Sequence, residues 1–442
     1  MVFAGETDSS SEMWIKNTVK ACLSSRWLSA LTPDSALISD PSNWMKPQQQ
    51  ATSRPMALRP FPPQHAVPSI TRRLFSASLP PPPPPHGFAR LTSRRLILLA
   101  GCDAPHFLQG LTTRNIPPST SQSDQDPTKG FYSAFLNASG RVLHDVFIYP
   151  GVPHHATAKE SPSFVIEVDA GEVHTLVKHL KRYKLRARIT VDILEDGELA
   201  AWSVWDEGKN VGPTARLQWL REDGASCTDE RAEKMGSRIL LPRDAKPELD
   251  SEEAPLQSYH VRRILEGVAE GQSEIFRESA LPLESNMDYM GGIDFQKGCY
   301  VGQELTIRTR HTGVVRKRIL PVQLYDSARP PEKLVYDPSQ QLAKLPRGTD
   351  IRRLNNKGRS TGKWLGGMGN VGLALCRLEN MRDITLTGES NQWSSEYEFG
   401  MAWDQGEGQD GCKVKVKAFV PEWHKNRINV RDTLRDGNIR SF

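Results

Sequence analysis

The sequence of 442 residues lacks the apolar run of about 18 residues that a membrane-spanning helix needs. Its longest apolar cluster near the front, residues 96–100, has only the length of a strand. The six cysteines form no C-x-x-C pair and are widely and irregularly spaced, so neither a zinc site nor a disulfide framework is indicated. We therefore expect no membrane span, no resident metal site and a reducing compartment.

A dominant charge of one sign is also missing from most of the chain. Residues 1–90 hold nine basic and five acidic residues, which leaves 48 basic and 47 acidic residues of the totals of 57 and 52 for the remainder. A protein built around nucleic-acid phosphates normally has a basic domain. The nearly neutral remainder therefore disfavours nucleic acid as a partner, and its length is sufficient for two or three domains.

Acidic residues are absent from residues 56–90, which carry four arginines and several serines. This composition is typical of a mitochondrial presequence, and residues 72–76 (Arg-Arg-Leu-Phe-Ser) resemble a matrix processing site. We expect a mitochondrial matrix protein whose working start is Met56. The alternative is a plain disordered tail. The proline run at 80–85 predicts a stiff polyproline spacer, so we expect residues 1–90 to form a disordered leader.

Residues 91–318 predict an α+β body. Alternating or apolar runs predict strands at 94–99, 131–136, 141–149, 164–168, 188–193 and 199–205. Helical patterns occur at 101–110, where Asp103 can cap the first turn, and at 173–183 and 259–271. Residues 206–231 and 243–253 are polar and predict loops. Strands and helices in this order favour helices packed on a mainly antiparallel sheet.

Residues 319–442 predict a small C-terminal β-barrel. Short strands are expected at 319–324, 348–352, 361–365, 372–377 and 412–420, separated by glycine-rich turns. The segment 379–411 is polar and predicts an insertion between two of these strands.

The stretch Lys-Gly-Cys-Tyr-Val-Gly-Gln-Glu at 297–304 carries the clearest chemistry. Gly298 and Gly302 allow backbone conformations that are closed to other residues. Cys299 between them follows Lys297 and precedes a basic run, and such positive charge, or a helix start at 302–304, favours the reactive thiolate. The alternative is that Cys299 is one more small buried side chain.

Residues 297–304 resemble the signature K-G-C-Y-x-G-Q-E of the YgfZ-type proteins, which are folate-binding relatives of the glycine-cleavage T-protein (aminomethyltransferase). Mitochondrial members of that family serve iron–sulfur cluster assembly. The resemblance extends from about residue 96 to about residue 424 and implies a T-protein-like body followed by the barrel. It makes Cys299 the candidate catalytic residue. The remaining candidates of this signature loop are Lys297, Gly298, Tyr300, Gly302, Gln303 and Glu304.

The predicted hairpin resembles the family motif L-N-x-x-G-R-V-x-x-D, which implies that Asn137, Arg141 and Asp145 bind a tetrahydrofolate-type ligand. Two departures argue against aminomethyl transfer. His144 stands where transferases usually show a second acid beside Asp145. Residues 263–267 resemble the transferase motif R-L-E-A-G, but Glu266 is displaced by one position, which turns a helical side chain by about 100°. We expect an assembly factor rather than an aminomethyltransferase.

The resemblance implies work with A-type scaffold proteins toward [4Fe–4S] clusters for aconitase-type, lipoate and radical-SAM enzymes. Cys299 then meets the cluster or the scaffold, and a cluster is held only transiently with the partner. Arg308, Arg310 and Arg316 are candidates to attract the folate glutamate tail or an acidic partner surface. Two alternatives stay open: a tetrahydrofolate-dependent one-carbon transferase, and a factor associated with RNA modification.

Overall fold

The structure is a computed structural model in which the chain divides into two units, Met1–Leu74 and Phe75–Phe442. All of the following concerns the second unit. The expected processing site at 72–76 and the possible start residues Met1 and Met56 lie outside the described residues. The described residues are 79–116, 129–151, 161–195, 198–207, 225–340, 345–354, 359–381, 394, 396–403 and 412–427.

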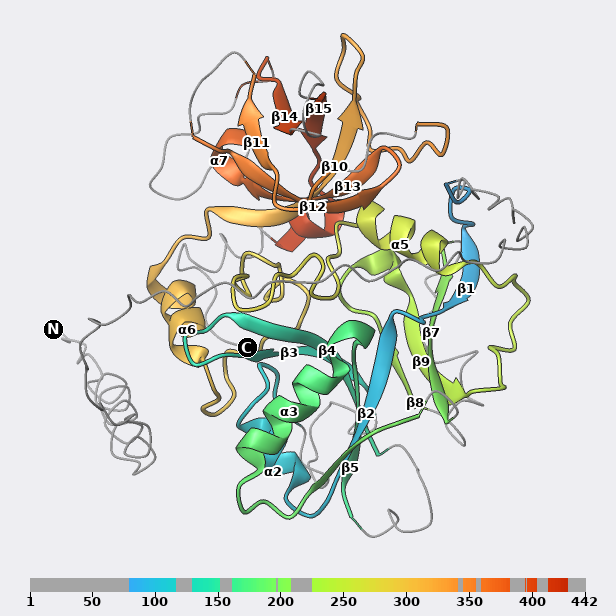
Figure 1. The fold of residues 1–442 in the computed structure, drawn as a ribbon, viewed down its shortest axis with the longest axis vertical. Coiled ribbons are helices and arrows are strands. Elements are labelled where there is room, and N and C mark those ends of the chain that lie inside the picture. Colours follow the sequence, from blue (N-terminus) through green and yellow to red (C-terminus); the bar gives the residue numbers. More distant parts are fainter. Residues whose placement is uncertain are drawn as a thin grey trace, which may run out of the picture. The chain divides into compact units, whose positions relative to one another are not determined.

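A five-stranded antiparallel sheet forms the first layer of the body, in the order β3-β4-β5-β2-β6. Its strands are β2 (Arg94–Ala100), β3 (Phe131–Leu136), β4 (Val142–Pro150), β5 (Ser163–Asp169) and β6 (Thr190–Ile193). The helices α2 (Ala104–Gln109) and α3 (Val173–Lys184) cover one face (Figure 1). The three strands β3, β4 and β5 are buried along nearly their whole length, because the other face is covered as well.

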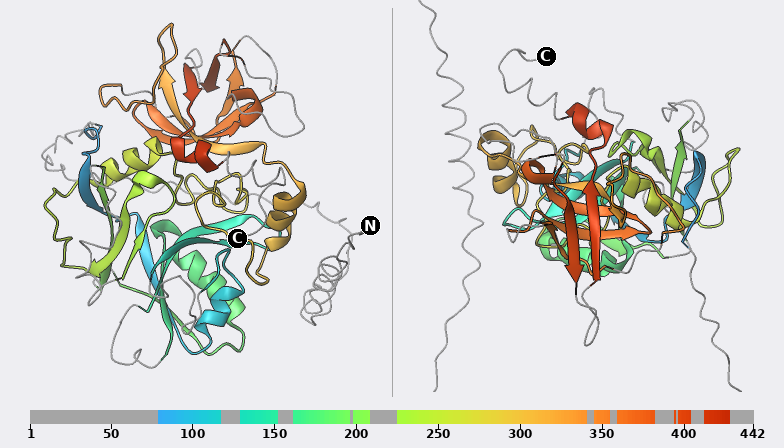
Figure 2. Two further views of the ribbon diagram at one scale, coloured as in Figure 1. Left: turned by 180° about the vertical axis from the view of Figure 1, so that it is seen from behind. Right: turned by 90° about the horizontal axis from the view of Figure 1, so that it is seen from above.

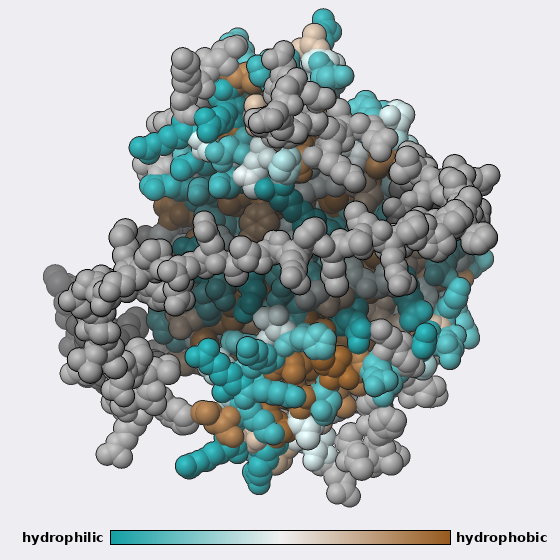
Figure 3. Space-filling view, viewed as in Figure 1, coloured by the Kyte–Doolittle hydropathy of each residue, from teal (hydrophilic) through white to brown (hydrophobic). Residues whose placement is uncertain are grey.

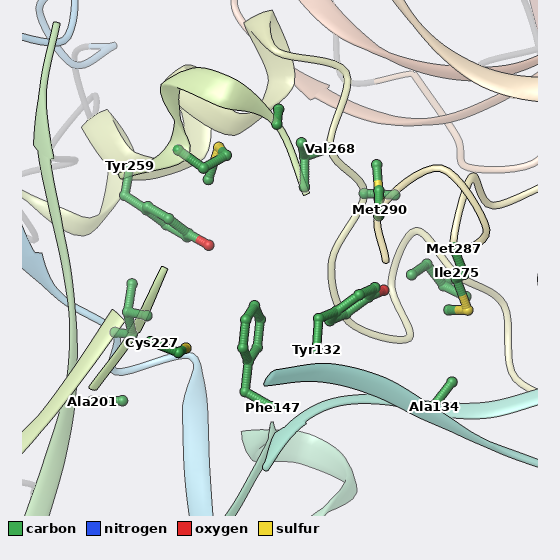
Figure 4. Packing of buried hydrophobic residues seen from close by; sticks show 14 of the residues in the cluster. Tyr132, Ala134, Phe147, Ala201, Cys227, Tyr259, Val268, Ile275, Met287 and Met290 are labelled. Carbon is green, nitrogen blue, oxygen red and sulfur yellow. The ribbon is translucent and has the colours of Figure 1, made fainter. Parts of the chain in front are cut away.

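A second, four-stranded sheet has the order β1-β7-β9-β8. Its strands are β1 (His86–Arg90), β7 (Leu199–Asp206), β8 (Ala225–Thr228) and β9 (Ser237–Pro242), and the helix α5 (Leu256–Leu265) follows them in the chain. Figure 4 shows how Phe147 of β4, Cys227 of β8 and Tyr259 of α5 point toward one another in the core that joins the two sheets. Burial of such large apolar side chains supplies most of the driving force for folding.

The C-terminal part is a closed antiparallel barrel in the order β10-β13-β12-β11-β14-β15. Its strands are β10 (Lys317–Tyr325), β11 (Asp350–Arg353), β12 (Gly362–Met368), β13 (Val371–Arg377), β14 (Phe399–Trp403) and β15 (Cys412–Ala418), with the short helix α7 (Leu378–Met381) after β13. The α+β body and the barrel confirm the expected fold class. No helix in the described ranges has the length and apolarity to cross a membrane.

Three expected loop or leader segments contain strands. β8 lies in the polar segment 206–231, β14 lies in the expected insertion 379–411, and β1 lies before residue 91. Each was missed because the strand has only four or five residues and is stabilised by pairing with a neighbouring strand rather than by its own composition. The proline run also belongs to the folded unit: the carbonyl oxygen of Pro84 accepts from Trp205 Nε1 (3.0 Å), and that of Pro80 accepts from Tyr336 Oη (2.8 Å).

Two local predictions about helices are corrected. Asp103 is the N-cap of α2 but its carboxylate forms no capping hydrogen bond, because it accepts from the backbone and the guanidinium of Arg188 instead. Helix α5 begins three residues before the expected start and ends at Leu265, so Glu266 is its C-cap. The positions of the other expected strands and helices agree with the structure within a few residues.

Candidate functional site

The signature loop runs along the surface of the body into the helix α6 (Gln303–Thr312). Cys299 is exposed, which decides against the alternative of a buried side chain. Gly298 is exposed too, and a Cβ atom there would meet nothing within 4 Å, so this position does not need glycine for space. Val301 donates its backbone N–H to the carbonyl oxygen of Gly110 at 3.0 Å and fastens the loop to the end of α2.

Lys297 anchors the loop before the cysteine. Its Nζ atom donates to the carbonyl oxygens of Gln109 (2.9 Å), Thr112 (2.6 Å) and Arg114 (3.0 Å). These carbonyls lie at and just beyond the C-terminal end of α2, where the helix dipole favours a cation. Burial lowers the pKa of Lys297 to about 8. The ammonium group therefore serves to fasten the loop rather than to stand free beside the thiol.

Gly302 anchors the loop after the cysteine. It is the N-cap of α6 with φ +80°, in the left-handed region that favours glycine. A Cβ atom there would overlap the carbonyl oxygen of Asn137 at the hairpin tip. Reciprocally, a Cβ on Gly140 would lie 2.9 Å from the carbonyl oxygen of Gly302. Two expected motifs, the signature and the hairpin, thus meet backbone to backbone, and Figure 2 shows α6 beside the end of that hairpin.

The other signature residues shape the turn into α6. Gln303 accepts the backbone N–H of Tyr300 through its side-chain oxygen at 3.1 Å. The ring of Tyr300 is buried and lies 5.0 Å from the Lys297 ammonium. Glu304 is exposed in the first helical turn, where the helix dipole favours a carboxylate. None of these three side chains blocks access to Cys299 from solvent, since the thiol is exposed.

The three candidate arginines lie on α6 and on the link to the barrel. Arg308 and Arg316 are exposed, whereas Arg310 is half-buried with its guanidinium 4.7 Å from the centre of the Phe295 ring. Arg316 borders a groove of about 370 Å³. The groove is lined by Leu281, Pro282, Leu283, Glu284, Leu305, Thr306, Thr309, Val314, Val315, Arg316, Lys317 and Arg377.

The three expected folate-binding residues do not gather in one place. The Asn137 side chain closes the hairpin tip by accepting from the backbone N–H of Ser139 and of Arg141. The guanidinium of Arg141 donates to the carbonyl oxygen of Ser279. Asp145, within strand β4, is completely buried. The structure thus places two of the residues beside the signature loop and the third inside the body.

Asp145 belongs to a set of buried ionic side chains that we call the charge cluster: Arg94, Asp145, Glu167, Asp229, Arg231, Arg238 and Glu270. Asp145 accepts the backbone N–H of Gly271 (3.1 Å) and lies 3.5 Å from Arg94 Nη1. Burial raises the pKa of Asp145 despite the opposing charge of Arg94. Burial would also raise the pKa of Glu270, but Arg238 and Arg231 outweigh it and hold that pKa well below its usual range.

The charge cluster was not anticipated as a site. Its members come from strands and loops far apart in the chain, so no local spacing connects them: Arg238 and Glu167 are 71 residues apart. The available signal was a charged residue inside an apolar strand, as Arg238 is within Ser237–Pro242. A buried charge needs partners, so such a residue predicts that partners exist without naming them.

A central pocket of about 230 Å³ opens above the charge cluster, between the body and the barrel. It is lined by Ser93, Arg94, Asp169, His260, Arg263, Ile264, Glu270, Gly271, Ser273, Glu274, Arg347, Gly366, Gly367 and Met368. Asp145 does not line it but holds two lining residues, Arg94 and Gly271. Glu266, compared above with the transferase acid, lies near Lys234 instead (3.8 Å), and the acids that line the pocket are Asp169, Glu270 and Glu274.

His144 cannot substitute for a second acid. Its ring is completely buried, and burial together with Arg277 and His179 lowers its pKa to about 3. The imidazole is therefore neutral at physiological pH and carries no charge to assist at a pteridine nitrogen.

The fold and the signature loop define a class, the T-protein-like proteins that end in a C-terminal β-barrel. The structure is similar to that of the glycine cleavage system aminomethyltransferase T from Bartonella henselae, with a TM-score of 0.50 and 14% sequence identity over 76% of this chain and 86% of that one. Residues 316–426 match the family described as CAF17, C-terminal beta-barrel domain.

Three fungal relatives narrow the class to one family. Each is named iron-sulfur cluster assembly factor IBA57 homolog, mitochondrial. The relative from Aspergillus oryzae is 47% identical over 391 residues, covering 83% of this chain and 86% of its own. The relative from Pyricularia oryzae is 50% identical and covers 76% of this chain and 84% of its own. The relative from Neurospora crassa is 45% identical and covers 84% of this chain and 89% of its own. The chain belongs to this family of mitochondrial assembly factors, which confirms the resemblance inferred from the signature.

Proposed function

We propose that this chain is an iron–sulfur cluster assembly factor of the mitochondrial matrix that acts with an A-type scaffold protein in the maturation of [4Fe–4S] enzymes. The single observation that carries the proposal is the exposed thiol of Cys299 on a loop fixed at both ends. Lys297 fastens one end through three carbonyl oxygens, and Gly302 packs the other against the hairpin tip. A reachable thiol at a defined position is what transfer or shared ligation of a cluster requires.

The cluster is cargo in this proposal, and Cys299 supplies one of its ligands. Iron–sulfur clusters are held by several thiolates, commonly four, so the partner contributes the others. Among the described residues no group of three or more His, Cys, Asp or Glu side chains is placed to hold a metal ion. Arg308, Arg310 and Arg316 lie on the helix and link that follow the cysteine, and they favour a partner with an acidic surface there.

We propose further that the central pocket receives the pteridine head of a tetrahydrofolate-type ligand. The Ser93 hydroxyl of the pocket lining is buried without a hydrogen-bond partner among the described residues, and Arg94 Nη1 has no hydrogen bond beyond its ion pair with Asp145 at 3.5 Å, so both atoms can serve the polar edge of such a ring. The volume of about 230 Å³ is below the usual range of about 300–1,000 Å³ for whole drug-sized ligands, so the pocket suits the head rather than the whole molecule. Asp145 then acts as a positioning residue for Arg94.

A pair of cysteine variants tests the assembly proposal in cells that lack the endogenous gene. Cys102 is an exposed cysteine elsewhere on the body and gives a matched control. Cells complemented with C299S should show lowered activity of aconitase-type and lipoate-dependent [4Fe–4S] enzymes and unchanged [2Fe–2S] enzymes, because the cluster then lacks one thiolate ligand. Cells with C102S should resemble those with the unsubstituted chain. Equal activities with both variants, or an equal loss in both classes of enzyme, would count against the proposal.

A further inference from the structure

A strongly basic and partly apolar surface lies on the body, at and beyond the C-terminal end of α3. Between residues 178 and 188 the chain has six cations and no acid: Lys178, Lys181, Arg182, Lys184, Arg186 and Arg188. Five of them are exposed, and Lys184 is half-buried. Within the described ranges only Arg188 of this set has an ion pair, with Asp103 at 3.1 Å. We call this surface, together with Tyr183 and Leu185, the α3 patch.

The patch is held rigidly by the body. The opposite side of α3 buries Val173, Leu176, Val177 and Leu180 against the five-stranded sheet, so the cations Lys178, Lys181 and Arg182 face outward at helical spacing. Beyond the helix, the backbone N–H of Ala187 donates to the carbonyl oxygen of Lys184 at 2.8 Å, and Arg188 is fixed to Asp103 through its backbone and its guanidinium. The cations are thus presented on a short, fastened turn.

Leu185 stands at the tip of this turn. Its side chain is 68% exposed, and its backbone has φ 43°, an unusual conformation for a residue other than glycine. An exposed leucine in a strained position costs stability and adds no packing, so the observation points to contact with something outside the chain. Figure 3 shows hydrophilic side chains next to an area of hydrophobic ones over the region that α3 occupies in Figure 1.

We propose that the α3 patch binds the surface of an anionic phospholipid bilayer. Clustered Lys and Arg attract anionic headgroups, and an exposed aliphatic side chain among them can enter the boundary with the acyl chains. A single-stranded nucleic acid fits less well. Leu185 has no π face on which a base could stack, and the ring of Tyr183 already contacts His179 at a centroid distance of 4.8 Å. The proposal is independent of the role of Cys299.

Flotation with vesicles tests the proposal on the full chain. The probe is a roughly three-to-one mixture of phosphatidylcholine and phosphatidylglycerol, compared with phosphatidylcholine alone. Binding should require the anionic lipid and weaken with salt. The double variant K181Q/R182Q should weaken it by about 25-fold, because each basic residue near such a surface contributes about fivefold. The charge-matched control R352Q/K363Q, on exposed barrel positions, should leave binding unchanged.

L185G separates membrane contact from folding. Glycine accepts a positive φ without strain, so this variant should unfold at the same or a higher temperature, yet bind anionic vesicles severalfold more weakly. All variants share residues 1–74, so any contribution of that segment cancels in the comparison. Absence of binding to anionic vesicles, or binding that neither variant weakens, would overturn the proposal. So would binding to a single-stranded RNA that exceeds binding to vesicles and is lost in the same variants.

Discussion

Glu270 neutralises two buried arginines of the charge cluster. One of its oxygens accepts from Arg231 Nη1 (2.9 Å), from Tyr259 Oη (2.7 Å) and from Arg238. All of these side chains are buried, so removing the carboxylate leaves two guanidinium groups underneutralised inside the body. Breaking a buried ionic network by removing one partner typically costs about 3–5 kcal/mol. Each charged group of the cluster is stabilised by its neighbours, and together they hold in place Arg94 and Glu270, which line the central pocket.

The variant E270Q should lower the free energy of unfolding at neutral pH by about 3–5 kcal/mol. It should also change the pH dependence. The native pKa of Glu270 is lowered below its ordinary value of 4.5, so in acid the unfolded chain takes up this proton first and stability falls with falling pH. Glutamine has no group that titrates here. In E270Q the free energy of unfolding should therefore fall less steeply below about pH 4.5, by up to about 1.4 kcal/mol per pH unit.

Urea unfolding followed by tryptophan fluorescence at several pH values measures both effects. E422Q, which removes an exposed carboxylate near Lys425, is the control and should change stability little. Curves of stability against pH that run parallel for E270Q and the unsubstituted chain would contradict the assignment of a lowered native pKa to Glu270.

At the scale of single residues, the sequence indicated which side chains carry the chemistry but not which groups they bind in the folded chain. Cys299 was identified as the candidate thiol, but its exposure could not be decided from the stretch alone. Lys297 was expected to bias the thiol, whereas the structure gives its ammonium to three carbonyl oxygens that precede it by more than 180 residues. Long-range hydrogen bonds of this kind leave no trace in local spacing.

At the scale of elements, the contact between the start of α6 and the hairpin tip positions the signature loop. Gly302 has a positive φ and no room for a Cβ atom, whereas Gly298 has room on every side. Gly302 thus has to be a glycine, whereas Gly298 can accept a larger residue. Substituting each of them by alanine compares the two positions within one motif.

G302A should lower the free energy of unfolding by about 2–4 kcal/mol, because the added methyl group overlaps the Asn137 carbonyl and the backbone is strained. It should also reduce cluster-dependent activity in complemented cells by shifting the loop. G298A should do neither to a measurable extent. Thermal unfolding and aconitase activity provide the readouts, and equal behaviour of the two variants would show that the loop is not anchored at Gly302.

Periodicity predicted most elements of the body and barrel because their apolar residues alternate or recur at helical spacing, as in β2 and α3. Strands β1, β8, β9 and β14 were not predicted, and the shortest of them, β1, β8 and β14, are stabilised by pairing rather than by composition. β14, for example, completes the barrel between β11 and β15 and contains a glycine at Gly400. A glycine-containing strand of only five residues next to a polar segment resembles a loop until its neighbours are known.

At the scale of the whole second unit, the body and the barrel are joined by buried contacts. Arg318 of β10 pairs with Asp288 of the body at 2.9 Å, and Trp423 Nε1 donates to the carbonyl oxygen of Glu266. The central pocket has walls from both parts. The sequence could not predict this pocket, because Arg94 and Gly366 come together only when the barrel meets the body.

G366L tests the folate proposal at this scale. A side chain at Gly366 has space, its nearest neighbour being Arg347 Nε at 3.7 Å, so a leucine should fill the pocket without disrupting β12. Calorimetric titration with 5-formyltetrahydrofolate should show an affinity reduced at least about tenfold, which corresponds to about 1.4 kcal/mol. K363L, at an exposed position of the same strand, should bind as before. Unaltered binding by G366L would place the ligand elsewhere.

The central claim is that the thiol of Cys299 meets the cluster together with a partner. The most direct measurement mixes the purified chain with an A-type scaffold protein, iron and sulfide under anaerobic conditions and records the visible absorption of the isolated complex. The account predicts a cluster-bearing complex for the unsubstituted chain and for C102S, and its loss for C299S although that variant remains folded. A complex of C299S with the same cluster absorption would contradict the account.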